Sequence, residues 1–98
     1  MYVVRRYLVA YDIADDRRLT SVRKVCQGYG FGLQYSVYLC DLTEVELYDL
    51  KADLLDIIVT KLDRIAIIDL GPADDRGSDC MQFLGIRPSL AWNDATIL

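Results

Sequence analysis

Histidine is absent from the 98-residue sequence. Its absence removes the side chain that most often acts as a general base near neutral pH and most often ligates transition metals. Any proton transfer or metal binding must therefore rely on carboxylates, which prefer hard cations such as Mg²⁺ or Mn²⁺.

Long apolar runs are lacking as well. No stretch reaches the roughly 18 to 20 apolar residues that cross a bilayer, and the N-terminus has no signal-peptide pattern. We therefore expect a soluble, cytoplasmic protein with no membrane partner.

Cysteine is scarce and shows no metal-binding or disulfide pattern. Cys26, Cys40 and Cys80 are odd in number, far apart and never in a C-x-x-C pair. Neither a disulfide framework nor a zinc site is indicated. Cys26 has a helical apolar spacing and Cys40 lies in a strand-like run, where a thiol acts as a small hydrophobe.

Apolar residues, by contrast, are abundant for so short a chain. A chain of 98 residues forms one small domain with a modest core, and 53% of its residues are hydrophobic. This fraction leaves apolar surface beyond what one copy can bury, so we expect an oligomer.

Positive charge is in the minority and concentrates near the N-terminus. The formal net charge is −4, which at first sight argues against a nucleic-acid partner. Residues 1–24, however, hold six basic and three acidic residues, whereas residues 25–98 hold five and twelve. Such asymmetry is typical of a basic binding edge on an acidic body. For any single residue, solvation of a helix face is the plainer alternative.

An acidic residue ends the first apolar run. Residues 2–12 alternate as a strand in which Tyr11 and Asp12 point to opposite faces. A carboxylate at the end of a buried strand is poorly hydrated, which is costly unless it is hydrogen-bonded, paired or bound to a metal. Arg17 and Arg18 follow, and guanidinium groups suit phosphate oxygens. A metal-binding acid beside a phosphate-binding edge is what phosphodiester chemistry needs.

Two helices separate the expected strands. The first runs from a cap at Asp15 to about Tyr29; acids in its first turn, Asp16 included, suit capping and the helix dipole first and metal contact second. The second begins at the capping box Thr43-x-x-Glu46 and ends near Thr60. The expected strands span residues 2–12, 32–41 (one bent strand or two short ones), 64–70 and 81–86. A polar loop is expected over residues 73–79.

This order predicts an α+β fold, a ferredoxin-like βαββαβ sandwich with two helices on one face of an antiparallel sheet. Residues 1–98 form a single domain with an extra C-terminal strand. Because the terminal strands exceed what this plan needs, we expect the tail, residues 87–98, to pack on a partner subunit, with Trp92 as an anchor. The fold alone decides no function, since this scaffold hosts many.

Several motifs resemble those of a known family. They are Tyr11-Asp12-Ile13-x-Asp15-Asp16-x-Arg18-Leu19-x-x-Val22, Tyr29-Gly30, Gln34-Tyr35-Ser36-Val37-Tyr38, the Asp41-Leu42-Thr43 helix start, the 64–70 strand and Leu84-Gly85. In order and separation they resemble the small CRISPR-associated endonuclease family, the smaller of the two core proteins that acquire spacers. The match covers most of the chain.

The resemblance implies a homodimer in which the strand-end aspartates of the two subunits face each other. Asp12 is the matching residue here, as the catalytic residue and as a ligand of a shared divalent metal, Mg²⁺ or Mn²⁺. Two close carboxylates repel, and a cation relieves that repulsion. The family is also described as cutting RNA or DNA, and as the central dimer on which duplex DNA lies between copies of a larger CRISPR-associated integrase.

Other site residues carried over by the resemblance are candidates for nucleic-acid binding: Tyr11, Arg17, Arg18, Ser36 and Tyr38. A plainer role competes for most of them. Tyr11 suits core packing, the two arginines suit solvation, and the Ser36 hydroxyl suits a backbone hydrogen bond. Tyr38 stands where the family usually has Phe.

Two functions follow from these observations. The first is a metal-dependent endonuclease that uses Asp12 from each subunit; the second is a non-catalytic DNA-binding scaffold for the integrase, in which Asp12 is dispensable. Gly32, Thr20 and Ser21 stand where many family members have basic residues, which weakens the nuclease hypothesis more than the scaffold hypothesis. A third alternative, a regulatory module for a small ligand, is disfavoured by the resemblance.

Overall fold

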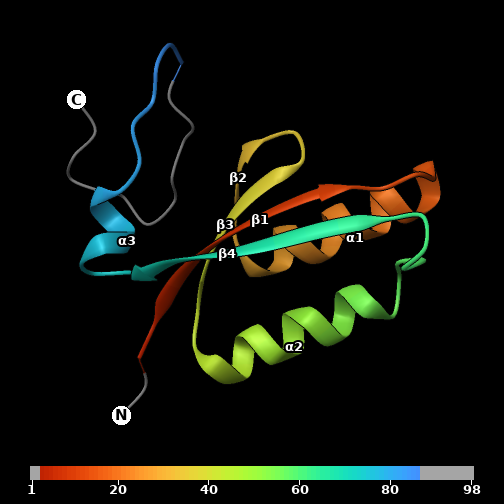
Figure 1. The fold of residues 1–98 in the computed structure, drawn as a ribbon, viewed down its shortest axis with the longest axis horizontal. Helices are drawn as coiled ribbons and strands as arrows, with labels where there is room; N and C mark the ends of the chain where they lie inside the picture. The colour runs from red at the N-terminus through yellow and green to blue at the C-terminus, as the bar shows by residue number, and fades with distance from the viewer. Residues whose placement is uncertain (1–2, 87–98) are drawn as a thin grey trace.

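The structure, a computed structural model, describes residues 3–86. Its elements follow the βαββαβ order expected from the sequence, with one short helix added (Figure 1). They are β1 (Arg5–Asp12), α1 (Asp16–Tyr29), β2 (Phe31–Gln34), β3 (Val37–Leu42), α2 (Glu44–Leu55), β4 (Arg64–Pro72) and α3 (Arg76–Asp79).

The four strands form one antiparallel sheet in the order β2-β3-β1-β4. The two central strands are therefore β1 and β3, and α1 and α2 contact each other and β3. This arrangement confirms the predicted ferredoxin-like α+β fold. None of the helices within residues 3–86 is long and apolar enough to cross a membrane.

The core lies between the sheet and the two long helices. Alternation along β1 buries Tyr7, Val9 and Tyr11, as expected from the sequence, and leaves Asp12 on the other face. The buried residues of the core cluster are Tyr7, Val9, Tyr11, Val22, Cys26, Tyr38, Cys40, Leu42, Leu50 and Leu54.

Helix α1 begins and ends where its sequence predicts. The Asp15 side chain caps the helix by accepting a hydrogen bond from the Arg18 N–H. Val22 and Cys26 are fully buried, so the predicted apolar stripe faces the core. Gly30 is the C-cap, and its N–H donates to the Cys26 carbonyl.

Helix α2 has the predicted capping box, in which Thr43 and Glu46 satisfy each other's backbone N–H groups. The helix ends at Leu55, earlier than the expected end near Thr60. The Val59 N–H donates to the Asp63 carboxylate at 2.8 Å, not to a carbonyl of the preceding turn. A side-chain acceptor thus replaces the helical hydrogen bond.

The C-terminal part of the described chain differs from the prediction. Strand β4 continues through Gly71 to Pro72. The proline is tolerated because β4 is an edge strand, and the pairing with β1 shifts register between Arg6 and Tyr7. Helix α3 lies inside the expected polar loop. Residues 81–86 are not a strand, since no described strand pairs with them, and Leu84 and Ile86 are almost fully exposed. The proposed tail, residues 87–98, lies outside the described residues.

Candidate functional site

Asp12 lies at the C-terminal end of β1, on the sheet face opposite the two long helices. Its carboxylate is exposed, and no other residue within 3–86 holds it by a hydrogen bond or ion pair. This corrects the expectation of a poorly hydrated acid. The buried residue at this end of the strand is the adjacent Tyr11, whereas the Asp12 carboxylate is exposed to water. The register partner of Asp12 on β4 is Arg64, which is also exposed.

The sheet surface next to Asp12 is lined by apolar side chains. Along the same face, Ala10 of β1 lies across from Ala66 of β4, and Leu8 lies across from Ile68. Ile68 is half exposed in the single chain. Ala10, Ala66 and Ile68 thus form an apolar strip on this face, and Asp12 and Arg64 lie at one end of it.

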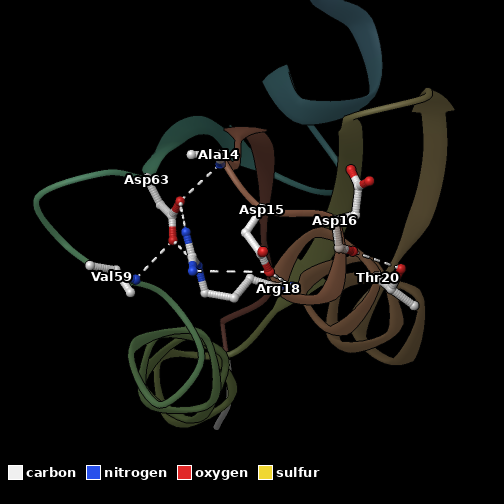
Figure 2. Close-up of polar contacts among 7 residues, drawn as sticks. All are labelled: Ala14, Asp15, Asp16, Arg18, Thr20, Val59 and Asp63. Atoms are coloured by element: carbon white, nitrogen blue, oxygen red, sulfur yellow. Dashed lines mark hydrogen bonds and ion pairs between the residues drawn. The ribbon is translucent and has the colours of Figure 1, made fainter.

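Arg18 is engaged inside the chain (Figure 2). Its Nε lies 2.8 Å from Asp63 Oδ2 and its Nη2 lies 3.1 Å from Asp63 Oδ1, a two-bond arrangement that suits the guanidinium fork. The Ala14 N–H donates to the same carboxylate at 2.9 Å, and the Val59 N–H at 2.8 Å. Asp63 thereby accepts four hydrogen bonds from three segments of the chain.

This pairing shifts the titration of both partners. The guanidinium of Arg18, helped by the two backbone N–H groups, holds the pKa of the Asp63 carboxyl well below its usual range, although burial opposes this. The same hydrogen bond to Asp63 raises the pKa of Arg18. Both groups stay charged, and the Arg18 fork is directed at Asp63. This arrangement therefore favours the internal pair with Asp63 over the expected contact between Arg18 and a phosphate.

Arg17 lies on the same helical turn but in a different environment. It is exposed and has no hydrogen-bond or ion-pair partner within the described chain. Its neighbour Asp15 is used as the helix cap, which confirms the capping role predicted for that acid. Of the two adjacent arginines, Arg17 is the one available to a phosphate.

Tyr11 and Tyr38 pack in the core, where they contact each other. Their ring centroids lie 6.2 Å apart with an interplanar angle of 19°, and they are 6% and 5% exposed. The Tyr11 hydroxyl donates to the Tyr35 carbonyl at 3.3 Å, and burial raises the pKa of Tyr11. Rings so deeply buried expose no face on which a base could stack, which favours the core role over the expected contact with nucleic acid.

Ser36 lies in the β2–β3 turn, beside the strand that carries Asp12. Its carbonyl accepts a hydrogen bond from the Tyr11 N–H at 3.1 Å, and the residue is partly buried. The backbone of Ser36 therefore holds the β2–β3 turn against Tyr11, the residue that precedes Asp12. No hydrogen bond of its hydroxyl is formed within residues 3–86.

Two residues of this region were missed by sequence reasoning. Asp63 lies 45 positions from Arg18, so no local pattern reports the pair. Tyr35, at the β2–β3 turn, is 72% exposed, and its ring lies 4.3 Å from the Arg23 guanidinium carbon. The only sequence signal for it was its place in the Gln34-Tyr35-Ser36-Val37-Tyr38 motif, next to Ser36.

The residues around Asp12 meet only part of what a divalent cation needs. Asp12 offers carboxylate oxygens, which are the ligands that Mg²⁺ and Mn²⁺ prefer. Within residues 3–86, however, no three cysteine, aspartate or glutamate side chains gather in an arrangement that could hold a metal ion. A cation at Asp12 fits the chemistry of the residue, but it needs further oxygen ligands from water, a nucleic acid or a second copy.

Comparison with known proteins fits these observations. The sequence profile of the family described as CRISPR associated protein Cas2 matches residues 5–76. The chain belongs to the Cas2 family. This confirms the family indicated by the Asp12, Arg18 and Ser36 motifs, and the matched range includes β1 to β4 and the Asp63 pairing.

Individual Cas2 proteins are similar over most of their length. The CRISPR-associated endoribonuclease Cas2 2 of Thermodesulfovibrio yellowstonii is 47% identical over 64 residues, which is 65% of this chain and 70% of that protein. The CRISPR-associated endonuclease Cas2 of Halalkalibacterium halodurans is 30% identical over 95 residues, or 92% and 96% of the two chains. The crystal structure of Streptococcus pyogenes Cas2 superposes with a TM-score of 0.70 at 34% identity, covering 82% and 99%.

Proposed function

We propose that this Cas2-family chain is a metal-dependent endonuclease of CRISPR spacer acquisition that acts in the cytoplasm as a homodimer, with Asp12 of each copy at the scissile phosphodiester. The observation that carries the proposal is the Asp12 carboxylate, exposed and unpartnered within the described chain, at a strand end. The proposal is supported by two relatives whose names are endoribonuclease and endonuclease.

Each proposed role follows from the placement of a side chain. The Asp12 carboxylate has no internal partner within residues 3–86, so it can ligate Mg²⁺ or Mn²⁺ or accept a proton. A divalent cation bound there would polarise a phosphate oxygen and lower the pKa of a bound water. Arg64, the register partner of Asp12 on β4, would bind a neighbouring phosphate oxygen. With no histidine in the sequence, a carboxylate or solvent must take the proton.

The proposed dimer supplies what a single chain does not. One copy contributes one Asp12, and residues 3–86 hold no ready metal site. The apolar strip of Ala10, Ala66 and Ile68 beside Asp12 suits burial against the same strip of a second copy. Such a contact would bring two carboxylates together, and a shared cation would relieve their repulsion.

The test is Asp12→Asn, which removes the charge and keeps the size of the side chain. We expect cleavage of RNA and DNA oligonucleotides in Mg²⁺ to fall by about 100-fold or more, because a cation ligand is lost. Asp74→Asn is the matched control, since Asp74 is also exposed but lies beside Val3 and Val4, away from the Asp12 end of β1. Equal cleavage by parent and Asp12→Asn, each purified and treated with or without EDTA, would overturn the nuclease proposal.

A second candidate function is a DNA-binding scaffold for the larger CRISPR-associated integrase. The observation that favours it is the exposed basic side of α1, where Arg17 and Lys24 have no acidic partner within the described chain. Spacer integration by the integrase with the Asp12→Asn chain separates the two functions. Integration that continues without cleavage supports the scaffold, and loss of both supports the nuclease.

A further inference from the structure

Asp63 connects the two chain segments that bracket the Asp12 site. Ala14, whose N–H it accepts at 2.9 Å, follows Asp12 by two residues. Arg64, the register partner of Asp12, follows Asp63 directly. The Asp63 side chain is fully buried, and its other hydrogen bonds come from Arg18 and Val59 (Figure 2). One carboxylate thus fixes the end of β1 and the start of β4.

The same carboxylate determines what Arg18 can contact. Two donors of the Arg18 fork point at Asp63, and the Arg18 side chain is 23% exposed. The next residue, Arg17, is exposed and unpaired within residues 3–86. A guanidinium that is already paired with a carboxylate gains little from a phosphate, because it must first give up that pair.

We propose that Asp63 is a positioning residue of the Asp12 site: it holds the strand end that presents Asp12, and it keeps Arg18 in an internal ion pair, away from nucleic acid. The first part rests on the proposed nuclease function. The second part concerns nucleic-acid binding alone, so it can be tested whether or not the chain cleaves its substrate.

The binding part is tested with Arg18→Met, compared with Arg17→Met as the matched control. Binding of a labelled DNA duplex is measured by fluorescence anisotropy over a series of salt concentrations. We expect Arg18→Met to leave the Kd within about twofold and the salt dependence unchanged, whereas Arg17→Met reduces the magnitude of the negative slope of log K against log salt by about 0.9. Equal losses in the two variants would overturn the proposal.

The positioning part is tested with Asp63→Asn. The substitution replaces one acceptor oxygen by an NH2 group, which faces N–H donors of Arg18, Ala14 and Val59. Arg18 is then released, and the end of β1 loses the hydrogen bond that holds it. We expect kcat to fall on the order of 10- to 100-fold. The freed guanidinium should tighten binding and steepen the salt dependence by about 0.9, and the double variant Asp63→Asn/Arg18→Met should return the slope to that of the parent.

Asp69→Asn is the control for this variant. Asp69 accepts two hydrogen bonds from Arg5, at 2.9 and 3.1 Å, and one from the Gly71 N–H, but it lies at the far end of β4 from Asp12. The substitution removes the same charge and releases an arginine away from the site. We expect kcat and the slope to stay close to those of the parent.

The outcomes separate this proposal from the proposed function. If Asp12→Asn cleaves like the parent, the nuclease proposal fails, while the binding comparison of Arg18→Met with Arg17→Met still decides the role of Arg18. If Asp63→Asn does not fold, that same comparison decides. An Asp63→Asn chain that folds and keeps the kcat, KM and salt slope of the parent would refute the positioning role. A merely structural loss would lower the active fraction without changing KM or the slope.

Discussion

Aspartates around the first turn of α1 lie in three different environments. Asp12 is exposed and has no internal partner within residues 3–86, Asp15 caps the helix, and Asp63 is buried with four hydrogen bonds. A carboxylate that already accepts several hydrogen bonds has little capacity left for a metal or a substrate. At the scale of single residues, Asp12 therefore remains available for chemistry, as does the exposed Asp16, whose carboxylate has no partner within residues 3–86 but lies on α1 and not at the strand end.

Arg17 carries a prediction at the same scale. Replacing Arg17 with alanine should weaken duplex binding and reduce the magnitude of the negative slope of log K against log salt by about 0.9, since one phosphate contact and its counterion release are lost. Arg76→Ala removes another exposed charge, on α3 beyond the end of β4 that is far from Asp12, and is the matched control. Salt titrations of both variants measure the effect, and an equal slope for the two would place the phosphate contacts elsewhere.

Sequence patterns could predict the single residues whose role is local. Asp15 and the Thr43–Glu46 box are separated from the groups they bind by three positions, so their caps follow from the pattern. The Arg18–Asp63 pair spans 45 positions and depends on the α2–β4 loop returning beside the end of β1. For that reason the sequence presented Arg18 as a free cation, and only the structure pairs it.

At the scale of elements, the join between α1 and β2 is closely packed. A Cβ at Gly30 would collide with the Leu39 carbonyl oxygen and lie 2.6 Å from the Cys40 sulfur, both on β3. The Gly30 backbone is extended, at a φ of −166°, so the requirement for glycine is close packing and not a left-handed turn. This contact sets where α1 ends and how the hairpin approaches it.

Gly30→Ala is therefore expected to destabilise the chain by about 1–3 kcal/mol, because β3 must move to admit the methyl group. Gly28→Ala is the matched control: it lies inside α1 with no heavy atom within 4 Å of the added Cβ. That change should stabilise the helix by about 0.5–1 kcal/mol. Urea unfolding of the two variants checks the pair, and a Gly30→Ala chain as stable as the parent would contradict the packing.

Most elements were predictable because periodicity and caps identify them. The 2–12 alternation, the apolar stripe of α1 and the capping box of α2 each gave an element of the right type. The errors came where a tertiary contact overrides the pattern. Helix α2 ends early: the Ile57 N–H turns to the Leu54 carbonyl and the Val59 N–H to Asp63. Residues 81–86 alternate like a strand but have no described strand to pair with.

At the scale of the whole molecule, two surfaces differ in their chemistry. One is the basic side of α1, where Arg17 and Lys24 are exposed; the other is the apolar strip of Ala10, Ala66 and Ile68 on the sheet. The first suits a polyanion and the second suits a second copy. A dimer built on the strip would carry a basic α1 on each copy.

The central claim is that Asp12 of two copies forms one site, and mixed dimers test it most directly. Parent and Asp12→Asn chains, carrying different tags, are combined in varying ratios at constant total concentration and allowed to exchange subunits. If both carboxylates are needed, cleavage in Mg²⁺ follows the square of the parent fraction, and an equal mixture keeps about a quarter of the parent rate. A linear decrease, or no decrease at all, would contradict a site shared by the two copies.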